Sequence, residues 1–179
     1  MTDLYNIGFG DQNFSIAVYM AKPPPMPEYS NMTTLTPLTC EHINTINQAC
    51  GNDWRKVFNV YAKVLFALPS EHYSFAKLTA TWQQYRDQYL LQHSSKTALL
   101  FSPPELTKGD TLHIIAGRTH AKNLINQAML TAQLDWLDDE FAVDKANKLI
   151  VCPYFDYRQL SNIKIARLSQ LVANCLESS

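Results

Sequence analysis

Four short apolar runs are spaced along the chain, and proline or glycine follows each of them closely. They are residues 14–20, 97–101, 112–116 and 149–152. Runs of this length that are apolar on both faces are typical of central strands covered by helices on both sides. The stretches between these runs show helical spacing, so the sequence predicts an α/β fold. We expect three α/β/α layers around a four-stranded, mostly parallel sheet.

Apolar residues that recur at intervals of three and four predict five helices between and after these strands. Their expected ranges are 39–50, 52–68, 78–92, 119–129 and 161–176. Three segments lack a clear period. Residues 1–13 are interpreted as an N-terminal arm, and residues 26–38 as a polar loop interrupted by prolines. Residues 135–144 are interpreted as an acidic connector that Trp136 and Phe141 anchor.

Composition places the chain among single globular domains. It has 179 residues, of which 46% are hydrophobic and 17% charged. A chain of this size and composition can form one hydrophobic core without disulfides or metal ions to stabilise it. The whole chain, residues 1–179, is therefore expected to form one domain. The formal net charge is −1. This charge disfavours binding that depends on a large basic surface, because neutralising many phosphates requires many excess lysines and arginines.

Cysteine and histidine spacing predicts no metal site and no cofactor. The four cysteines form no CxxC pair, and the five histidines form no HxxxH or HExxH pair. Free thiols fit a reducing compartment, and no apolar run approaches the roughly 20 residues that span a bilayer. We therefore expect a cytoplasmic protein with no membrane association.

Four loops are expected to meet at one edge of the sheet, because the carboxyl ends of parallel strands lie together. These loops are residues 21–25, 102–104, 117–120 and 153–158. Open α/β sheets bind their ligands at this edge. The sequence therefore predicts a binding site there.

The third loop supplies the best candidate for binding an anion. Gly117 precedes Arg118 and His120 at the predicted start of a helix, where backbone N–H groups favour negative charge. Lys22, with Pro24 and Ser102 from the other loops, faces the same crevice in this interpretation. The alternative for Lys22 is a surface lysine beside a proline turn.

The last loop is dense in aromatic and charged residues. Tyr154 and Tyr157 can stack on a base, while Arg158 and Asn162 can bind polar edges or a phosphate. Asp156 is the carboxylate that would serve as a general base if the protein is an enzyme. The alternative is a loop pinned by its own aromatic residues, with Asp156 and Arg158 forming a local ion pair.

The order of these loops resembles the uracil-DNA glycosylase-like superfamily. In that family a Gly-Glu-Ala-Pro-Gly loop, a Pro-Pro element, a Gly-x-x-Ala-x-x-Leu helix start and a His-Pro-Ser motif follow successive strands. The corresponding residues are 21–25, 102–104, 117–124 and 152–154, and the resemblance spans about residues 14–176. The chain is also similar to conserved bacterial proteins of this length. The resemblance implies a uracil-DNA glycosylase-like fold.

This sequence differs from that family at the positions of the catalytic residues. The family uses an acid or amide of the first loop to position water, and the histidine of the last motif to stabilise the departing uracil anion. Lys22 and Cys152 occupy the matching positions here. We therefore expect a nucleobase- or nucleotide-containing ligand, or nucleic acid, without retained uracil excision. Whether the protein is an enzyme stays open, and the alternative is a non-catalytic scaffold that binds a protein partner.

Overall fold

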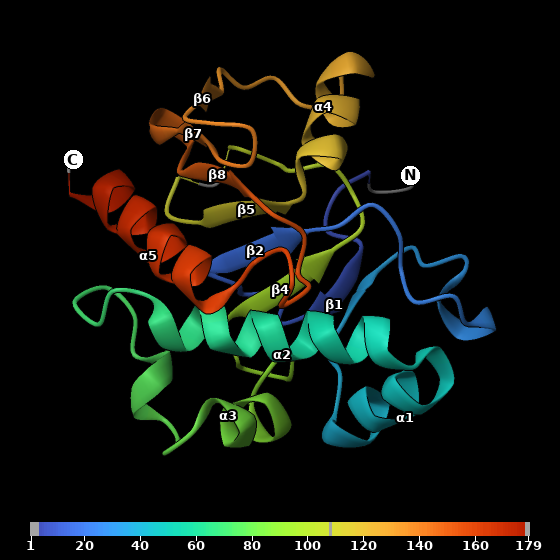
Figure 1. Ribbon diagram of the computed structural model, residues 1–179. Coiled ribbons are helices and arrows are strands. Elements are labelled where there is room, and N and C mark those ends of the chain that lie inside the picture. The colour runs from blue at the N-terminus through green and yellow to red at the C-terminus, as the bar shows by residue number, and fades with distance from the viewer. Residues whose placement is uncertain (1–3, 108, 178–179) are drawn as a thin grey trace.

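A single eight-stranded sheet forms the centre of the molecule (Figure 1). The computed structural model describes residues 4–107 and 109–177. The strands, in chain order, are β1 (Gly8–Gly10), β2 (Ile16–Tyr19), β3 (Leu35–Thr36), β4 (Thr97–Leu100), β5 (Leu112–Ala116), β6 (Asp135–Trp136), β7 (Ala142–Asp144) and β8 (Leu149–Cys152). The spatial order is β3-β1-β4-β2-β5-β8-β7-β6.

The four strands expected from the sequence are the parallel centre of this sheet. β2 pairs in parallel with β4 on one side and with β5 on the other, and β5 pairs in parallel with β8. The α/β class is thus confirmed. The expectation of only four strands is wrong, because β1 and β3 extend one edge and the β6–β7 hairpin extends the other.

The extra strands come from segments whose sequence carries no apolar run. β1 lies within the predicted N-terminal arm, β3 within the predicted loop, and β6 and β7 within the predicted acidic connector. These strands are only two or three residues long. Segments this short contain too few residues to show a period of two, so backbone pairing with a neighbouring strand decides their structure.

Five α-helices enclose the sheet in the described part of the chain. They are α1 (Cys40–Cys50), α2 (Asn52–Ala67), α3 (Trp82–Gln88), α4 (Arg118–Asn126) and α5 (Asn162–Leu176). α2 crosses one face with α1 and α3 packed against it and α5 alongside, while α4 covers the other face (Figure 1). Each central strand alternates between the two cores: Ile16 and Val18 join the larger one, and Ala17 and Tyr19 the smaller one.

The helix boundaries follow local capping. The Thr39 hydroxyl accepts from the His42 N–H, and the His42 ring accepts from the Thr39 N–H, which fixes the start of α1. α3 is shorter than the predicted 78–92, because Thr81 caps it and Leu91 adopts a left-handed φ of 59° beyond its end. α5 begins directly after Ser161, as predicted.

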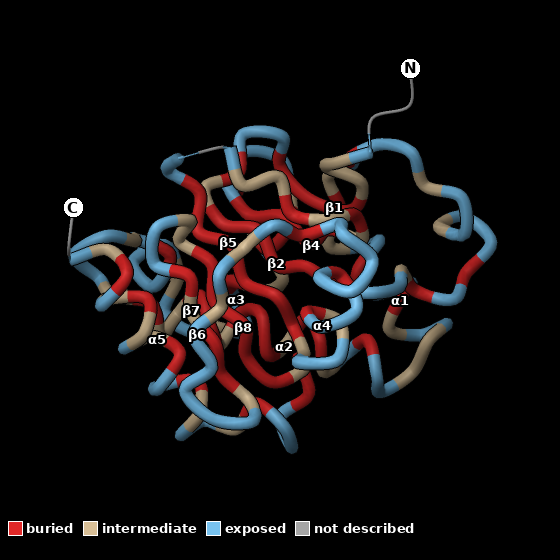
Figure 2. The backbone as a smooth tube through the Cα atoms, turned by 90° about the horizontal axis from the view of Figure 1, so that it is seen from above, coloured by how far each residue is buried: buried red, intermediate tan, exposed pale blue. Residues whose placement is uncertain are grey.

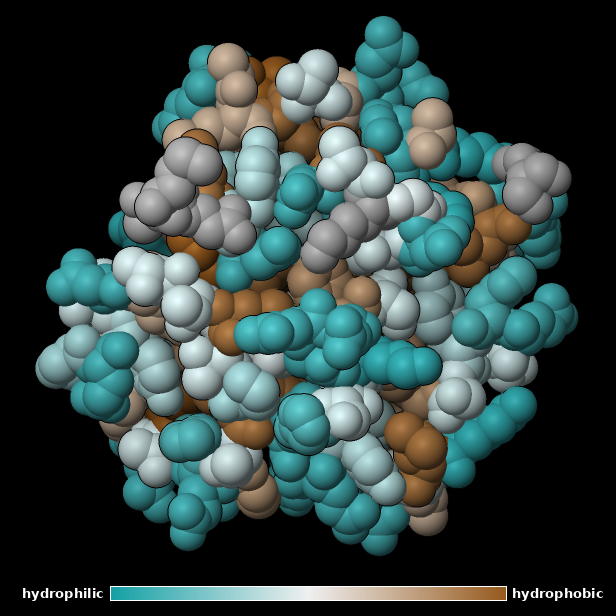
Figure 3. Space-filling model, turned by 180° about the vertical axis from the view of Figure 1, so that it is seen from behind, coloured by the Kyte–Doolittle hydropathy of each residue, from teal (hydrophilic) through white to brown (hydrophobic). Residues whose placement is uncertain are grey.

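The arrangement leaves the sheet buried and the polar side chains outside. Figure 2 shows the central strands buried, whereas loops, outer helix faces and the edge strand β6 are exposed. On the face seen in Figure 3, hydrophobic side chains appear as separate small patches among polar ones. Among residues 4–107 and 109–177, no helix is both long and apolar enough to cross a membrane.

Candidate functional site

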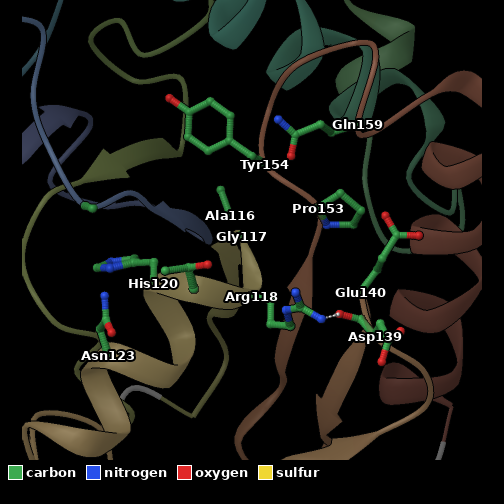
Figure 4. A pocket seen from close by; sticks show the side chains of 12 residues that line it. Ala116, Gly117, Arg118, His120, Asn123, Asp139, Glu140, Pro153, Tyr154 and Gln159 are labelled. Atoms are coloured by element: carbon green, nitrogen blue, oxygen red, sulfur yellow. Dashed lines mark hydrogen bonds between the residues drawn. The ribbon is translucent and has the colours of Figure 1, made fainter.

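A cavity of about 600 Å³ opens at the carboxyl ends of β5 and β8 (Figure 4). Its lining residues are Ala21, Ala116, Gly117, Arg118, Thr119, His120, Asn123, Asp139, Glu140, Pro153, Tyr154 and Gln159. Three of the four predicted loops therefore contribute to it: the loops after β2, β5 and β8. The β6–β7 hairpin adds a wall that the sequence did not indicate.

The first turn of α4 lies directly on this cavity. Gly117 precedes the helix with a φ of +104°, a conformation that side chains rarely adopt, and its N–H donates to the Cys152 carbonyl at 2.8 Å. No side chain caps the helix start. The N–H groups of Arg118, Thr119 and His120 therefore carry the positive end of the helix dipole to the cavity.

The Arg118 side chain links the start of α4 to the β6–β7 hairpin. Its Nη1 donates to the Asp139 carbonyl at 3.1 Å, the dashed line in Figure 4. Within the described part of the chain, Arg118 forms no ion pair with a carboxylate. The Glu140 carboxylate, on the hairpin wall, pairs with Lys164 Nζ at 2.8 Å. The Arg118 guanidinium thus keeps donors available for an anionic ligand.

His120 and Asn123 lie one helical turn apart on the cavity side of α4 (Figure 4). Burial lowers the pKa of the His120 imidazole below 6.5, which favours the neutral ring at pH 7. Its Nε2 is buried and has no hydrogen-bond partner in the described structure. A neutral ring nitrogen of this kind can donate to or accept from a bound molecule, depending on its tautomer.

Tyr154 provides an aromatic surface in the lining of the cavity. It is half-buried, and burial raises the pKa of its phenol, with Asp53 and Asp156 adding to the effect. The hydroxyl is therefore protonated at neutral pH and can donate a hydrogen bond. Gln159 follows on the same loop and offers both an amide donor and an amide acceptor.

Asp156 lies outside the cavity and is paired locally. Its carboxylate accepts from the Arg158 N–H at 2.9 Å and from Arg158 Nη2 at 3.1 Å, and Lys56 Nζ lies at 3.5 Å. The hydrogen bond from the Arg158 side chain is the main cause that lowers the pKa of Asp156 to about 2. This arrangement is the local ion pair that the sequence analysis gave as the alternative for Asp156. A carboxylate with a pKa this low is a weak base.

The remaining candidates of the last loop also lie elsewhere. Tyr157 and Arg158 are exposed and do not line the cavity, and Asn162 lines a separate groove between α2, α3 and α5. One loop thus contributes residues to two different surfaces. Only Tyr154 of this set reaches the cavity.

The first two loops contribute less than expected. Lys22 is exposed, Pro24 is buried, and neither lines the cavity, where Ala21 alone represents the first loop. Ser102 is buried and its hydroxyl accepts from the Ile7 N–H at 3.1 Å. Pro103 and Pro104 turn toward the N-terminal segment and line another groove. Strand order explains the second loop, since β4 lies beyond β2 as seen from β5 and β8.

Cys152, at the position of the glycosylase histidine, belongs to the core. It is fully buried, its Sγ donates to the Pro153 carbonyl at 3.4 Å, and burial raises the pKa of its thiol. In the residues that the structure describes, no group of three or more His, Cys, Asp or Glu side chains is placed to hold a metal ion.

Comparison with known proteins assigns a family. No curated protein and no solved structure matches this sequence. Residues 7–173 match the model of DUF6942, a family of unknown function, and this match covers nearly all of the helices and strands described above. The chain therefore belongs to the DUF6942 family.

Proposed function

We propose that the cavity at the ends of β5 and β8 binds a small ligand that contains a nucleobase or a nucleotide. One observation carries the proposal: the uncapped first turn of α4, the Arg118 guanidinium and the Tyr154 ring line the same cavity. Its volume of about 600 Å³ lies within the range of small-molecule sites, roughly 300–1,000 Å³.

The anionic group of such a ligand would lie at the start of α4. Three N–H groups without side-chain caps and an arginine without an ion pair in the described structure converge there. Helix N-termini favour phosphate, and a guanidinium binds phosphate oxygens through two parallel hydrogen bonds. A single phosphate matches this set better than a triphosphate, because Asp139 and Glu140 add negative charge to the same lining.

The base would lie toward Tyr154. Its ring provides a stacking surface, and its protonated hydroxyl provides a donor. Neutral His120 with Asn123 and Gln159 supplies donors and acceptors suited to the polar edges of a base. The unpartnered Nε2 of His120 supports this assignment, because a buried polar atom gains most from a bound partner.

Binding is proposed rather than uracil excision. Lys22 and Cys152 replace the catalytic groups of the glycosylases that the sequence resembles, and neither lines the cavity. A uracil-DNA glycosylase-like architecture stays part of this proposal. It is supported by the four motif-bearing strands, β2, β4, β5 and β8, which are adjacent and parallel.

A thermal-shift screen of the purified protein tests the proposal. The probes are nucleobases, nucleoside monophosphates and short single-stranded uracil-containing DNA. A ligand at 100 times its Kd stabilises the folded state by about 2.7 kcal/mol. At least one probe should therefore raise Tm, and this rise should be lost in Arg118→Ala and in Tyr154→Ala.

Two matched variants control for nonspecific effects. Arg55 and Tyr157 are exposed and lie outside the cavity lining, so Arg55→Ala and Tyr157→Ala should keep the shift. No shift with any probe, or an undiminished shift in Arg118→Ala, would contradict the proposal. The absence of any shift would favour the alternative of a non-catalytic protein-interaction scaffold, for which exposed Tyr157, Arg158 and Asn162 are the supporting observation.

A further inference from the structure

A second concave surface lies on the helical side of the molecule, away from the cavity. This surface, here called the α2 groove, has a volume of about 440 Å³ and runs between α2, α3 and α5. Its lining residues are Lys63, Phe66, Ala67, Trp82, Asn162, Ile165 and Ala166, none of which lines the cavity. Figure 1 shows the three helices side by side there.

The floor of the α2 groove is apolar and extends onto the surface. Ile165 is buried in the main core, and half-buried Phe66 packs against that core and is partly exposed at the groove. Ile163 does not line the groove, but it is 84% exposed and lies one helical turn before Ala166, which does. An isoleucine this exposed provides apolar surface that a partner can cover.

Cations held over aromatic rings form the rim. Lys63 Nζ lies 5.2 Å from the centre of the Trp82 ring, and the Arg86 guanidinium lies 5.6 Å from it. Arg86 is paired within the chain: its Nη1 donates to Asn59 Oδ1 at 2.7 Å, and its Nε and Nη2 donate to the Asp87 carboxylate at 2.9 and 3.4 Å. Lys63 forms no ion pair with any carboxylate of the described residues. Ring contacts of this kind fix the position of the charge before a partner binds.

The positive charge continues along the exposed side of α2. Lys56, two turns before Lys63, lies 5.5 Å over the Tyr157 ring and shares the Asp156 carboxylate with Arg158. On this stretch four cations, Lys56, Lys63, Arg86 and Arg158, lie near three carboxylates, Asp87, Asp156 and Asp53, the last of which acts on Arg158. The stretch therefore keeps a small positive excess, although the chain as a whole carries a net charge of −1.

From the charge and the apolar floor together, we propose that the α2 groove docks an acidic segment of a partner protein. A carboxylate of the partner would contact Lys63, and an apolar side chain of the partner would lie on Phe66. A peptide suits the surface better than single-stranded nucleic acid. The positive excess of the stretch is too small to neutralise a phosphate backbone, and the Trp82 ring already carries two cations. This inference does not rest on the function proposed for the cavity.

The experiment is a selection of peptides on the full chain. A library of random dodecapeptides is selected on the wild-type protein, and the enriched peptides are measured by fluorescence anisotropy at 50 and 300 mM NaCl. We expect enrichment of Asp and Glu around one apolar position, with binding that weakens as salt rises. Lys63→Glu should weaken the selected peptides at least tenfold.

The chain offers a close control. Lys122 Nζ lies 5.1 Å over the Trp136 ring on the other side of the sheet, so Lys122→Glu makes the same change in the same kind of contact. It should leave peptide binding unchanged. The proposal is overturned if the selection yields no acidic enrichment, or if both lysine variants lose binding equally. Tighter binding of a single-stranded dodecanucleotide than of any selected peptide would also overturn it.

Discussion

Arg158 donates to the carboxylate of Asp156 from its backbone N–H and from its side chain, two residues along the same loop. The carboxylate therefore shapes the turn that leads from β8 into α5. Asp156→Asn should lower the free energy of unfolding at pH 7 by about 1–2 kcal/mol, because hydrogen bonds to a charged group are lost. Urea denaturation measures this change. If Asp156→Asn instead left stability intact and abolished ligand binding, a functional role for this carboxylate would be favoured.

The stability that Asp156 provides should disappear in acid. Its pKa is about 2 in the folded protein against 3.8 ordinarily, so the unfolded chain takes up the proton first as the pH falls. The contribution is fully present above about pH 4 and is lost toward pH 2. The difference between wild type and Asp156→Asn in urea should therefore shrink between pH 4 and pH 2. A difference that stays constant over this range would show that the ion pair is not its source.

The central architecture was predictable because it depends on long apolar patterns. The four parallel strands and the N-terminal ends of α1 and α5 lie where periodicity, prolines and capping residues indicate. The sheet edges were not predictable. β3 and β6 have two residues each, and no local pattern in segments of this length distinguishes a strand from a loop.

The position of the cavity could be predicted from topology rather than from its residues. Gly117, Arg118, His120 and Tyr154 line one cavity because β5 and β8 are neighbours in the sheet. Asn123 could have been found from its spacing of three after His120 on the same helix. Asp139 and Glu140 could not, since only the pairing of β7 with β8 brings their hairpin to the cavity.

Acidification should also reveal the buried state of His120. Burial holds its pKa below 6.5, so the unfolded chain binds the proton first and the folded state loses stability as the pH falls through that value. His120→Gln should flatten the dependence of unfolding free energy on pH between 7 and 5. The exposed His72 provides the control, and His72→Gln should keep the wild-type slope. Equal slopes in all three proteins would exclude His120 as the source.

β1 approaches β4 so closely that only glycine fits. A Cβ on Gly10 would lie 2.3 Å from the Thr97 carbonyl oxygen, and its φ of +132° disfavours any side chain. Gly10→Ala should therefore separate β1 from β4 and lower the free energy of unfolding by at least about 2 kcal/mol. Gly109→Ala is the matched control, because a Cβ there meets no atom within 4 Å. Similar stability of the two variants in urea would contradict the close pairing of β1.

Cys152 should behave as a buried hydrophobic residue and not as a nucleophile. Its thiol is fully buried and its pKa is raised, so little thiolate forms at neutral pH and no reagent reaches it. Iodoacetamide at pH 7.5 should label Cys40, which is partly exposed, and leave Cys152 unmodified until urea unfolds the protein. Mass spectrometry of the digested protein separates the two sites.

Rapid labelling of Cys152 in the folded state would show that β8 opens at its end or that the thiol is activated. Cys152→Ala should then distinguish these cases, since only loss of an activated thiol would abolish a ligand-dependent activity while the protein stays folded.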